Sequence, residues 1–67
     1  MFNERIREAR QQCGLTQKQV AEKLGITDNA LCQYEKGVRE PSISTIIELC
    51  KLYDVSADYL LGLTDDY

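Results

Sequence analysis

Apolar residues recur at helical spacing along most of the chain, and short polar breaks divide the repeats. Between residues 15 and 37 they fall three or four positions apart, as on the buried side of a helix. Apolar and polar residues do not alternate anywhere as they do in a half-buried strand. The chain is therefore predicted to be all-helical. In this central part the predicted inward positions are Val20, Ala21, Leu24, Leu31 and Tyr34.

The same central part contains start and stop signals for two helices. Thr16 and Gln19 have the spacing of a capping box, and Gly25 can adopt the left-handed conformation that ends a helix. Thr27 can cap again at once, and Gly37 supplies the second stop. A turn of three residues then holds the two helices at a fixed angle. The predicted helices span residues 17–24 and 28–36.

Three further helices are predicted on either side of this unit. Asn3 is expected to cap the first, which Gly14 ends, and its apolar stripe is Phe2, Ile6, Ala9 and Cys13. Pro41 and Ser42 open the next helix and Asp54 ends it. Its expected inner side carries Ile43, Ile46, Ile47, Cys50 and Tyr53. Ser56 caps a last short helix that Gly62 closes.

A chain of 67 residues allows one small domain. Its 43% hydrophobic and 28% charged residues are ordinary for a folded protein. We expect a compact all-α bundle of five helices over residues 1–67, with a core from 2 to 62 and a frayed tail from 63 to 67.

Four polar residues lie on the outward side of the 28–36 helix, at intervals of about one turn. They form one ridge that is narrow enough to enter a major groove of DNA. Each could instead be an ordinary solvated surface residue, but their grouping on one ridge favours a common role. The four are Asp28, Asn29, Gln33 and Lys36.

The net charge of −3 is unfavourable for a protein that must neutralise phosphates. The charge is, however, unevenly divided. Residues 1–39 carry seven basic and five acidic side chains, a balance of +2, whereas residues 40–67 carry one and six, a balance of −5. The acidity is therefore concentrated away from the predicted reading helix, and DNA binding stays compatible with the composition.

The remaining composition argues against other classes of protein. Three widely spaced cysteines with no histidine do not support a zinc site, and we expect Cys13, Cys32 and Cys50 to be reduced core residues. No nucleophile and base converge, so an enzyme is not expected. No apolar run approaches the length of a membrane span, and the charged N-terminus is unlike a secretory signal. We expect a cytoplasmic protein without metal, cofactor or small-molecule ligand.

From Ile6 to Gly62 the chain resembles the phage-repressor and Cro type of helix-turn-helix domain, the XRE family. The matching segments are LTQKQVAEKLGIT, YEKG, REPS and VSADYLLG, in this order. The resemblance implies a five-helix bundle whose third helix lies in the major groove while the second crosses the backbone. It also implies an ion pair between Arg10 and Glu35, which agrees with the need of an inward-facing charge for a partner.

The resemblance also implies roles for single residues. Asn29 and Gln33 are the expected base readers, because an amide presents a donor and an acceptor to the edge of adenine. Asp28 suits a helix N-terminus, or it could accept a hydrogen bond from cytosine. The expected backbone contacts are Gln17, Thr27, Lys36 and Arg39.

One reading helix covers few base pairs, so a homodimer on paired half-sites of double-stranded DNA is expected. The C-terminal residues Tyr59, Leu61 and Leu63 are the candidate dimer surface, although with Leu60 they could serve only to close the monomer core. The leading function is a transcriptional regulator that occupies operator DNA as a repressor. The alternative is a protein-interaction module of antitoxin or anti-repressor type.

Overall fold

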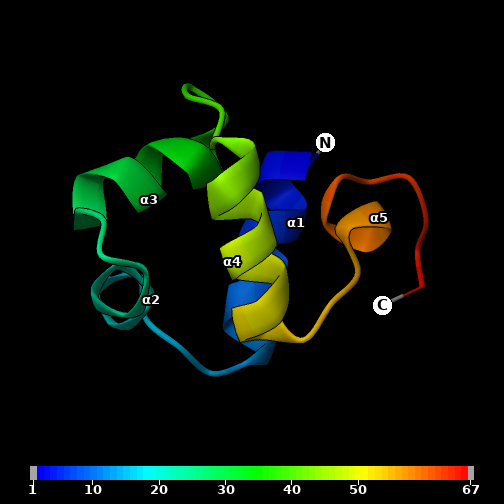
Figure 1. Ribbon diagram of the computed structural model, residues 1–67, viewed down its shortest axis with the longest axis horizontal. Helices are drawn as coiled ribbons and strands as arrows, with labels where there is room; N and C mark the ends of the chain where they lie inside the picture. Colours follow the sequence, from blue (N-terminus) through cyan, green and yellow to red (C-terminus); the bar gives the residue numbers. More distant parts are fainter. Residues whose placement is uncertain (1, 67) are drawn as a thin grey trace.

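The computed structural model describes residues 2–66; Met1 and Tyr67 lie outside that range. The described residues form five helices and no strand, which confirms the predicted all-α bundle (Figure 1). The helices are α1 (Phe2–Gln12), α2 (Gln17–Leu24), α3 (Asp28–Lys36), α4 (Ile43–Tyr53) and α5 (Ala57–Leu60).

Side-chain hydroxyls fix where the helices begin. The capping box of α2 is complete, because the Thr16 hydroxyl accepts from the Gln19 amide and the Gln19 side chain accepts from the Thr16 amide. The Thr27 hydroxyl caps α3 by accepting from the Ala30 amide, and serines at positions 42 and 56 cap α4 and α5. Gly25 is left-handed at φ 70°, which reverses the chain between α2 and α3. The turn that sets the angle between these helices is therefore specified locally.

Three of the other four helices pack against α1. These are α3, α4 and α5, while α2 packs against α3 and α4 (Figure 1). As a result α3 is held from two sides, by α1 and by α2.

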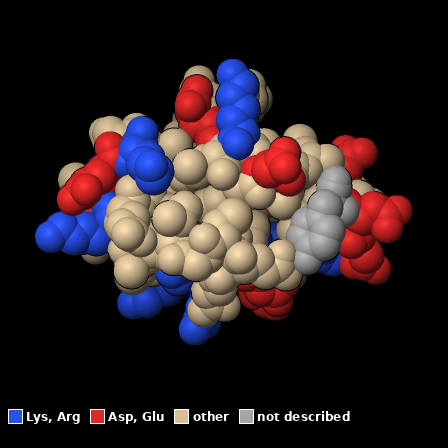
Figure 2. Space-filling model, turned by 90° about the horizontal axis from the view of Figure 1, so that it is seen from below, with Lys and Arg blue, Asp and Glu red and all other residues tan. Residues whose placement is uncertain are grey.

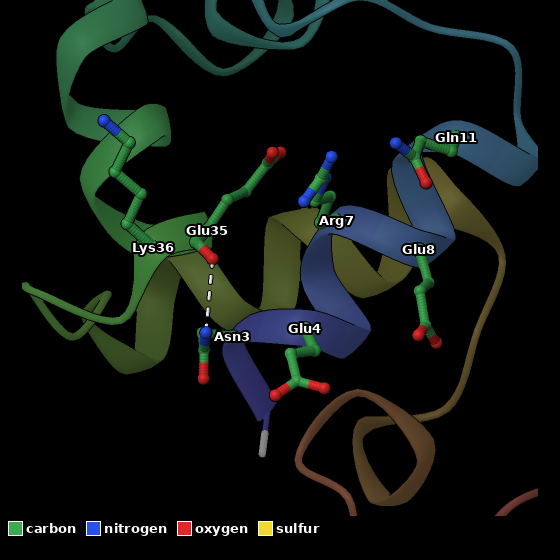
Figure 3. A pocket seen from close by; sticks show the side chains of 7 residues that line it. All are labelled: Asn3, Glu4, Arg7, Glu8, Gln11, Glu35 and Lys36. Carbon is green, nitrogen blue, oxygen red and sulfur yellow. Dashed lines mark hydrogen bonds between the residues drawn. The ribbon is translucent and has the colours of Figure 1, made fainter.

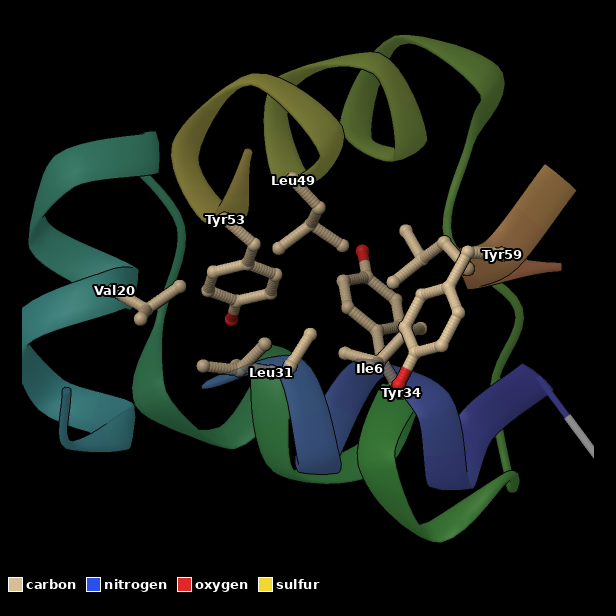
Figure 4. Close-up of a cluster of buried hydrophobic side chains, with 9 residues drawn as sticks. Ile6, Val20, Leu31, Tyr34, Leu49, Tyr53 and Tyr59 are labelled. Atoms are coloured by element: carbon tan, nitrogen blue, oxygen red, sulfur yellow. The ribbon is translucent and has the colours of Figure 1, made fainter. Parts of the chain in front are cut away.

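All five helices contribute to one core, part of which is drawn in Figure 4. The tyrosine rings of α3, α4 and α5 fill space between aliphatic side chains of α1, α2 and α4. Burial of such apolar surface is the main stabilising contribution in a domain of this size. The buried core residues are Ile6, Ala9, Val20, Leu31, Tyr34, Leu49, Tyr53, Tyr59 and Leu60.

The predicted inner side of α4 is wrong at two positions. Ile43 is 80% exposed and Ile47 is 47% exposed. The packed stripe is centred instead on Leu49, which is fully buried and which completes a helical spacing with Ile46 and Tyr53. Ile47 precedes Leu49 by two residues and so lies about 160° around the helix from it, on the side away from the packed stripe.

The start and end of α1 also differ from the prediction. Asn3 lies inside α1 instead of capping it, and its side-chain amide donates to the backbone carbonyl of Glu35 at 3.2 Å. Cys13 is exposed, because α1 ends at Gln12 and the chain turns away there. The expectation of a core cysteine is therefore wrong at this position, while Cys32 and Cys50 are partly buried.

Two residues of the expected tail contact α1. Arg5 donates to the carbonyl of Thr64 and to the carboxylate of Asp65, and its guanidinium lies 4.5 Å from the centre of the Tyr59 ring. These contacts hold residues 64 and 65 against the bundle.

No helix within residues 2–66 has the length and apolar character that crossing a bilayer requires.

Tyr53 has a buried hydroxyl that finds no hydrogen-bond partner within residues 2–66. We expect Tyr53→Phe to leave the free energy of unfolding at pH 7 unchanged or to raise it by up to about 1 kcal/mol, since the variant removes an unsatisfied polar group. Thermal denaturation followed by circular dichroism measures this difference. A clear loss of stability would mean that the hydroxyl is bonded.

The same variant should also differ from wild type at high pH. Burial raises the pKa of Tyr53, with a further contribution from Glu35, above the ordinary value of about 10. Because the folded state prefers the neutral phenol, its stabilisation is complete below the unfolded-state pKa and declines as pH rises above it. Wild type should therefore lose stability faster than Tyr53→Phe above about pH 10. Parallel losses would contradict this.

Candidate nucleic-acid interface

The outward side of α3 carries polar side chains that are not used inside the bundle. Asp28, Asn29 and Lys36 are exposed, and Gln33 is partly exposed. Within the part of the chain that the structure describes, none of these four side chains has a recorded hydrogen bond or ion pair. Donors and acceptors on one rigid helix are thus available to an outside partner.

An ion pair joins this helix to α1. Arg10 Nε donates to Glu35 Oε2 at 2.7 Å and Arg10 Nη2 donates to Glu35 Oε1 at 3.1 Å. The Glu35 side chain is only 3% exposed and that of Arg10 13%. The hydrogen bonds to Glu35 raise the pKa of Arg10 against the opposing effect of burial, so the guanidinium stays charged. The structure therefore pairs the two residues that the family resemblance implies.

The pair also reaches the turn before α2 and the first turn of α2 itself. Arg10 Nη1 donates to the backbone carbonyl of Leu15 at 2.9 Å, and Gln17 Nε2 donates to Glu35 Oε1 at 3.0 Å. One carboxylate of α3 thus accepts from both α1 and α2. Because a primary amide has two N–H groups, Gln17 keeps one donor beyond the bond to Glu35.

The two ends of α3 carry the other expected backbone contacts. The Thr27 hydroxyl accepts from the Ala30 amide, which leaves its own proton to donate. At the other end Arg39 lies over the buried ring of Tyr34, with its guanidinium 5.7 Å from the ring centre. The guanidinium is held close to the C-terminal end of α3 by this contact.

A neighbouring hollow contains two residues that the sequence alone does not place near the interface. It has a volume of about 290 Å³ and lies where α1, α2 and α3 meet. Arg7 and Cys32 belong to it although neither was expected near the interface. Arg7 precedes Arg10 by three residues, which places both on one side of α1, and that spacing is the signal that points to it. The lining residues are Arg7, Arg10, Gln17, Cys32, Glu35 and Lys36.

Charge is divided across the molecule much as it is along the sequence. In Figure 2 acidic side chains gather at the right-hand end, on the side where Figure 1 places α5 and the C-terminus. Over the rest of that view basic side chains are interspersed with single acidic ones. A polyanion is therefore repelled least at the side of α2 and α3.

The candidate dimer surface is smaller than expected. Tyr59 is 4% exposed and packs in the monomer core with Leu60, so it offers little surface to a second copy. Leu61 and Leu63 are 42% and 74% exposed. Within residues 57–66 these two leucines are the large apolar side chains that are exposed.

The cysteines do not form a recognisable centre. All three are free, and burial raises the pKa of the Cys50 thiol, which disfavours its reactive thiolate. Over residues 2–66 no cluster of three or more acidic or cysteine side chains is arranged as a metal site.

Comparison with known proteins gives a consistent result. A helix-turn-helix family profile matches residues 6–60. The chain is 52% identical over 61 residues, 91% of its length, to the HTH-type transcriptional regulator ImmR of Bacillus subtilis (strain 168). It is 44% identical over 66 residues, 98% of its length, to the uncharacterized HTH-type transcriptional regulator YobD of the same organism. It is also 38% identical over 55 residues, 82% of its length, to the cryptic phage CTXphi transcriptional repressor RstR of Vibrio cholerae.

These relatives are longer proteins. The matches cover 48% of ImmR, 59% of YobD and 50% of RstR. The chain thus spans about half the length of the curated relatives that it matches.

Proposed function

Because this chain belongs to the XRE-type helix-turn-helix family, we propose that it is a sequence-specific DNA-binding regulator of transcription whose α3 enters the major groove. The observation that carries the proposal is the exposed ridge from Asp28 to Lys36 on a helix that α1 and α2 hold in place. A major groove about 12 Å wide admits one helix. The relatives are named as transcriptional regulators, and we extend that role to this chain.

Within this proposal Asn29 and Gln33 read bases, and residues around them position the protein. Asparagine and glutamine match the N6 and N7 edge of adenine. Lys36 at the end of the ridge, with Gln17, Thr27 and Arg39 beside it, contacts phosphates. Asp28 stabilises the N-terminus of α3, at some cost in repulsion from phosphates. Binding takes place without catalysis, metal or cofactor, in the cytoplasm where the DNA is.

The proposed binding unit is a homodimer on two half-sites. A single α3 contacts only a few base pairs, so two copies about one helical turn apart are needed for useful specificity. The exposed Leu61 and Leu63 supply apolar surface for that contact. The relationship to a phage repressor supports action by repression.

A binding titration against random duplex DNA at several salt concentrations tests the proposal. Affinity should fall steeply with salt, with a slope of about −0.9 for each phosphate neutralised. Selection of bound duplexes from a random pool should then return a sequence with two-fold symmetry. Absence of duplex binding at low salt would contradict the proposal and favour a protein-interaction module of antitoxin or anti-repressor type.

A further inference from the structure

We propose that Arg7 of α1 forms, with Gln17 and Lys36, a site for one phosphate of the duplex backbone. The inference rests on the proposed function and extends the DNA-contacting surface beyond the helix-turn-helix unit to the first helix. It starts from the hollow of about 290 Å³ between α1, α2 and α3.

The charges that line this hollow favour an anion. Arg7, Arg10 and Lys36 face a single carboxylate, that of Glu35, which gives a formal balance of +2 in a chain whose net charge is −3. Arg10 is already committed to Glu35 by two hydrogen bonds, so these two charges largely cancel. The cationic excess therefore belongs to Arg7 and Lys36, which have no recorded anionic partner within residues 2–66.

The side chains also point to a common side. Figure 3 draws an adjoining hollow that Arg7, Glu35 and Lys36 also line. The guanidinium of Arg7 and the ammonium of Lys36 rise there on the same side, with the Glu35 carboxylate between them, while the carboxylates of Glu4 and Glu8 point away from that side. Gln17 donates one N–H to that carboxylate and has a second to offer. Arg7, Gln17 and Lys36 thus offer a phosphate oxygen donors from three helices. Two α1 residues line the hollow, and of these Arg10 is already paired with Glu35 whereas Arg7 is not.

The Arg10–Glu35 pair positions this site. Without Arg10 to neutralise it, the carboxylate of Glu35 would repel a phosphate close to Gln17. With the pair intact, the Glu35 carboxylate holds the Gln17 amide, and the charge of Arg10 offsets the repulsion between that carboxylate and a phosphate. A phosphate at this position would lie beside the outward ridge of α3 and fix how that ridge enters the groove.

The test is a salt titration of binding to a random duplex with Arg7→Gln, Arg7→Lys and Lys51→Gln. Arg7→Gln should reduce the magnitude of the salt slope by about 0.9 and weaken binding about eightfold at 0.1 M salt, the effect of one phosphate contact. Arg7→Lys should keep the wild-type slope. Lys51→Gln removes the same charge from the exposed end of α4 and should leave the slope unchanged. Arg7 is exposed, so unchanged thermal unfolding should accompany all three variants.

The outcomes separate this inference from the function on which it rests. Wild-type binding with an unchanged slope in Arg7→Gln would overturn the Arg7 site alone. Failure of wild type to bind any duplex would overturn both proposals. A further titration replaces chloride by inorganic phosphate at constant ionic strength. Displacement of duplex from wild type that is weaker from Arg7→Gln would support the site, because free phosphate would then compete with the backbone phosphate at Arg7, whereas equal displacement from both would contradict it.

Discussion

Replacing Arg10 by alanine is expected to lower the free energy of unfolding by about 3–5 kcal/mol, the usual cost of leaving a buried charge unpaired. Glu35 would lose both bonds from Arg10 while its side chain stays in a site that is only 3% exposed. A domain of 67 residues has roughly 3–10 kcal/mol of total stability. Thermal denaturation should therefore show a fall of at least about 12 °C, or a chain that is unfolded at room temperature.

A double variant provides the control for this prediction. Arg10→Met combined with Glu35→Leu replaces both charges by apolar side chains, so no buried charge is left without a partner. It should be more stable than Arg10→Ala and nearer to wild type. A melting temperature of Arg10→Ala equal to that of wild type would contradict the buried pair.

Loss of both expected base readers should reduce the affinity for the selected operator by at least about thirtyfold. Each good bidentate contact to a base contributes about 1–3 kcal/mol of discrimination, so Asn29→Ala with Gln33→Ala removes at least about 2 kcal/mol. Affinity for random duplex should stay within about twofold of wild type, since phosphate contacts are kept. Binding titrations on the two duplexes measure both quantities.

A matched substitution elsewhere separates base reading from general effects. Gln11→Ala removes the same type of side chain from the exposed face of α1 and should leave both affinities unchanged. Equal losses on operator and random duplex in the Asn29 and Gln33 variant would mean that these residues contact the backbone only. Such a result would contradict their assigned role.

Local signals in the sequence were sufficient to predict the helix boundaries around α2 and α3. Caps and stops depend on neighbouring residues only, and Thr16, Thr27 and Gly25 behave as their types dictate. The side of α4 that is buried depends instead on where its partners lie. Ile43 and Ile47 have the same apolar character as Ile46, yet only the third packs against the core.

The same distinction applies to the candidate interface. The ridge of α3 follows from helical spacing, but the position of Gln17 against Glu35 depends on how α2 meets α3. The sequence alone does not single out Arg7, because an exposed arginine on α1 resembles any solvated charge until α3 is packed beside it. The sequence also cannot place Tyr59, since an aromatic residue at this position suits a core and an interface equally, and packing buries it in the core.

The most direct measurement is a crystal structure of the protein bound to the duplex recovered from a random pool. We expect α3 in the major groove, with the side-chain amides of Asn29 and Gln33 within hydrogen-bonding distance of base edges. A complex in which another element occupies the groove, or in which the ridge from Asp28 to Lys36 faces solvent, would contradict the proposed mode of DNA recognition.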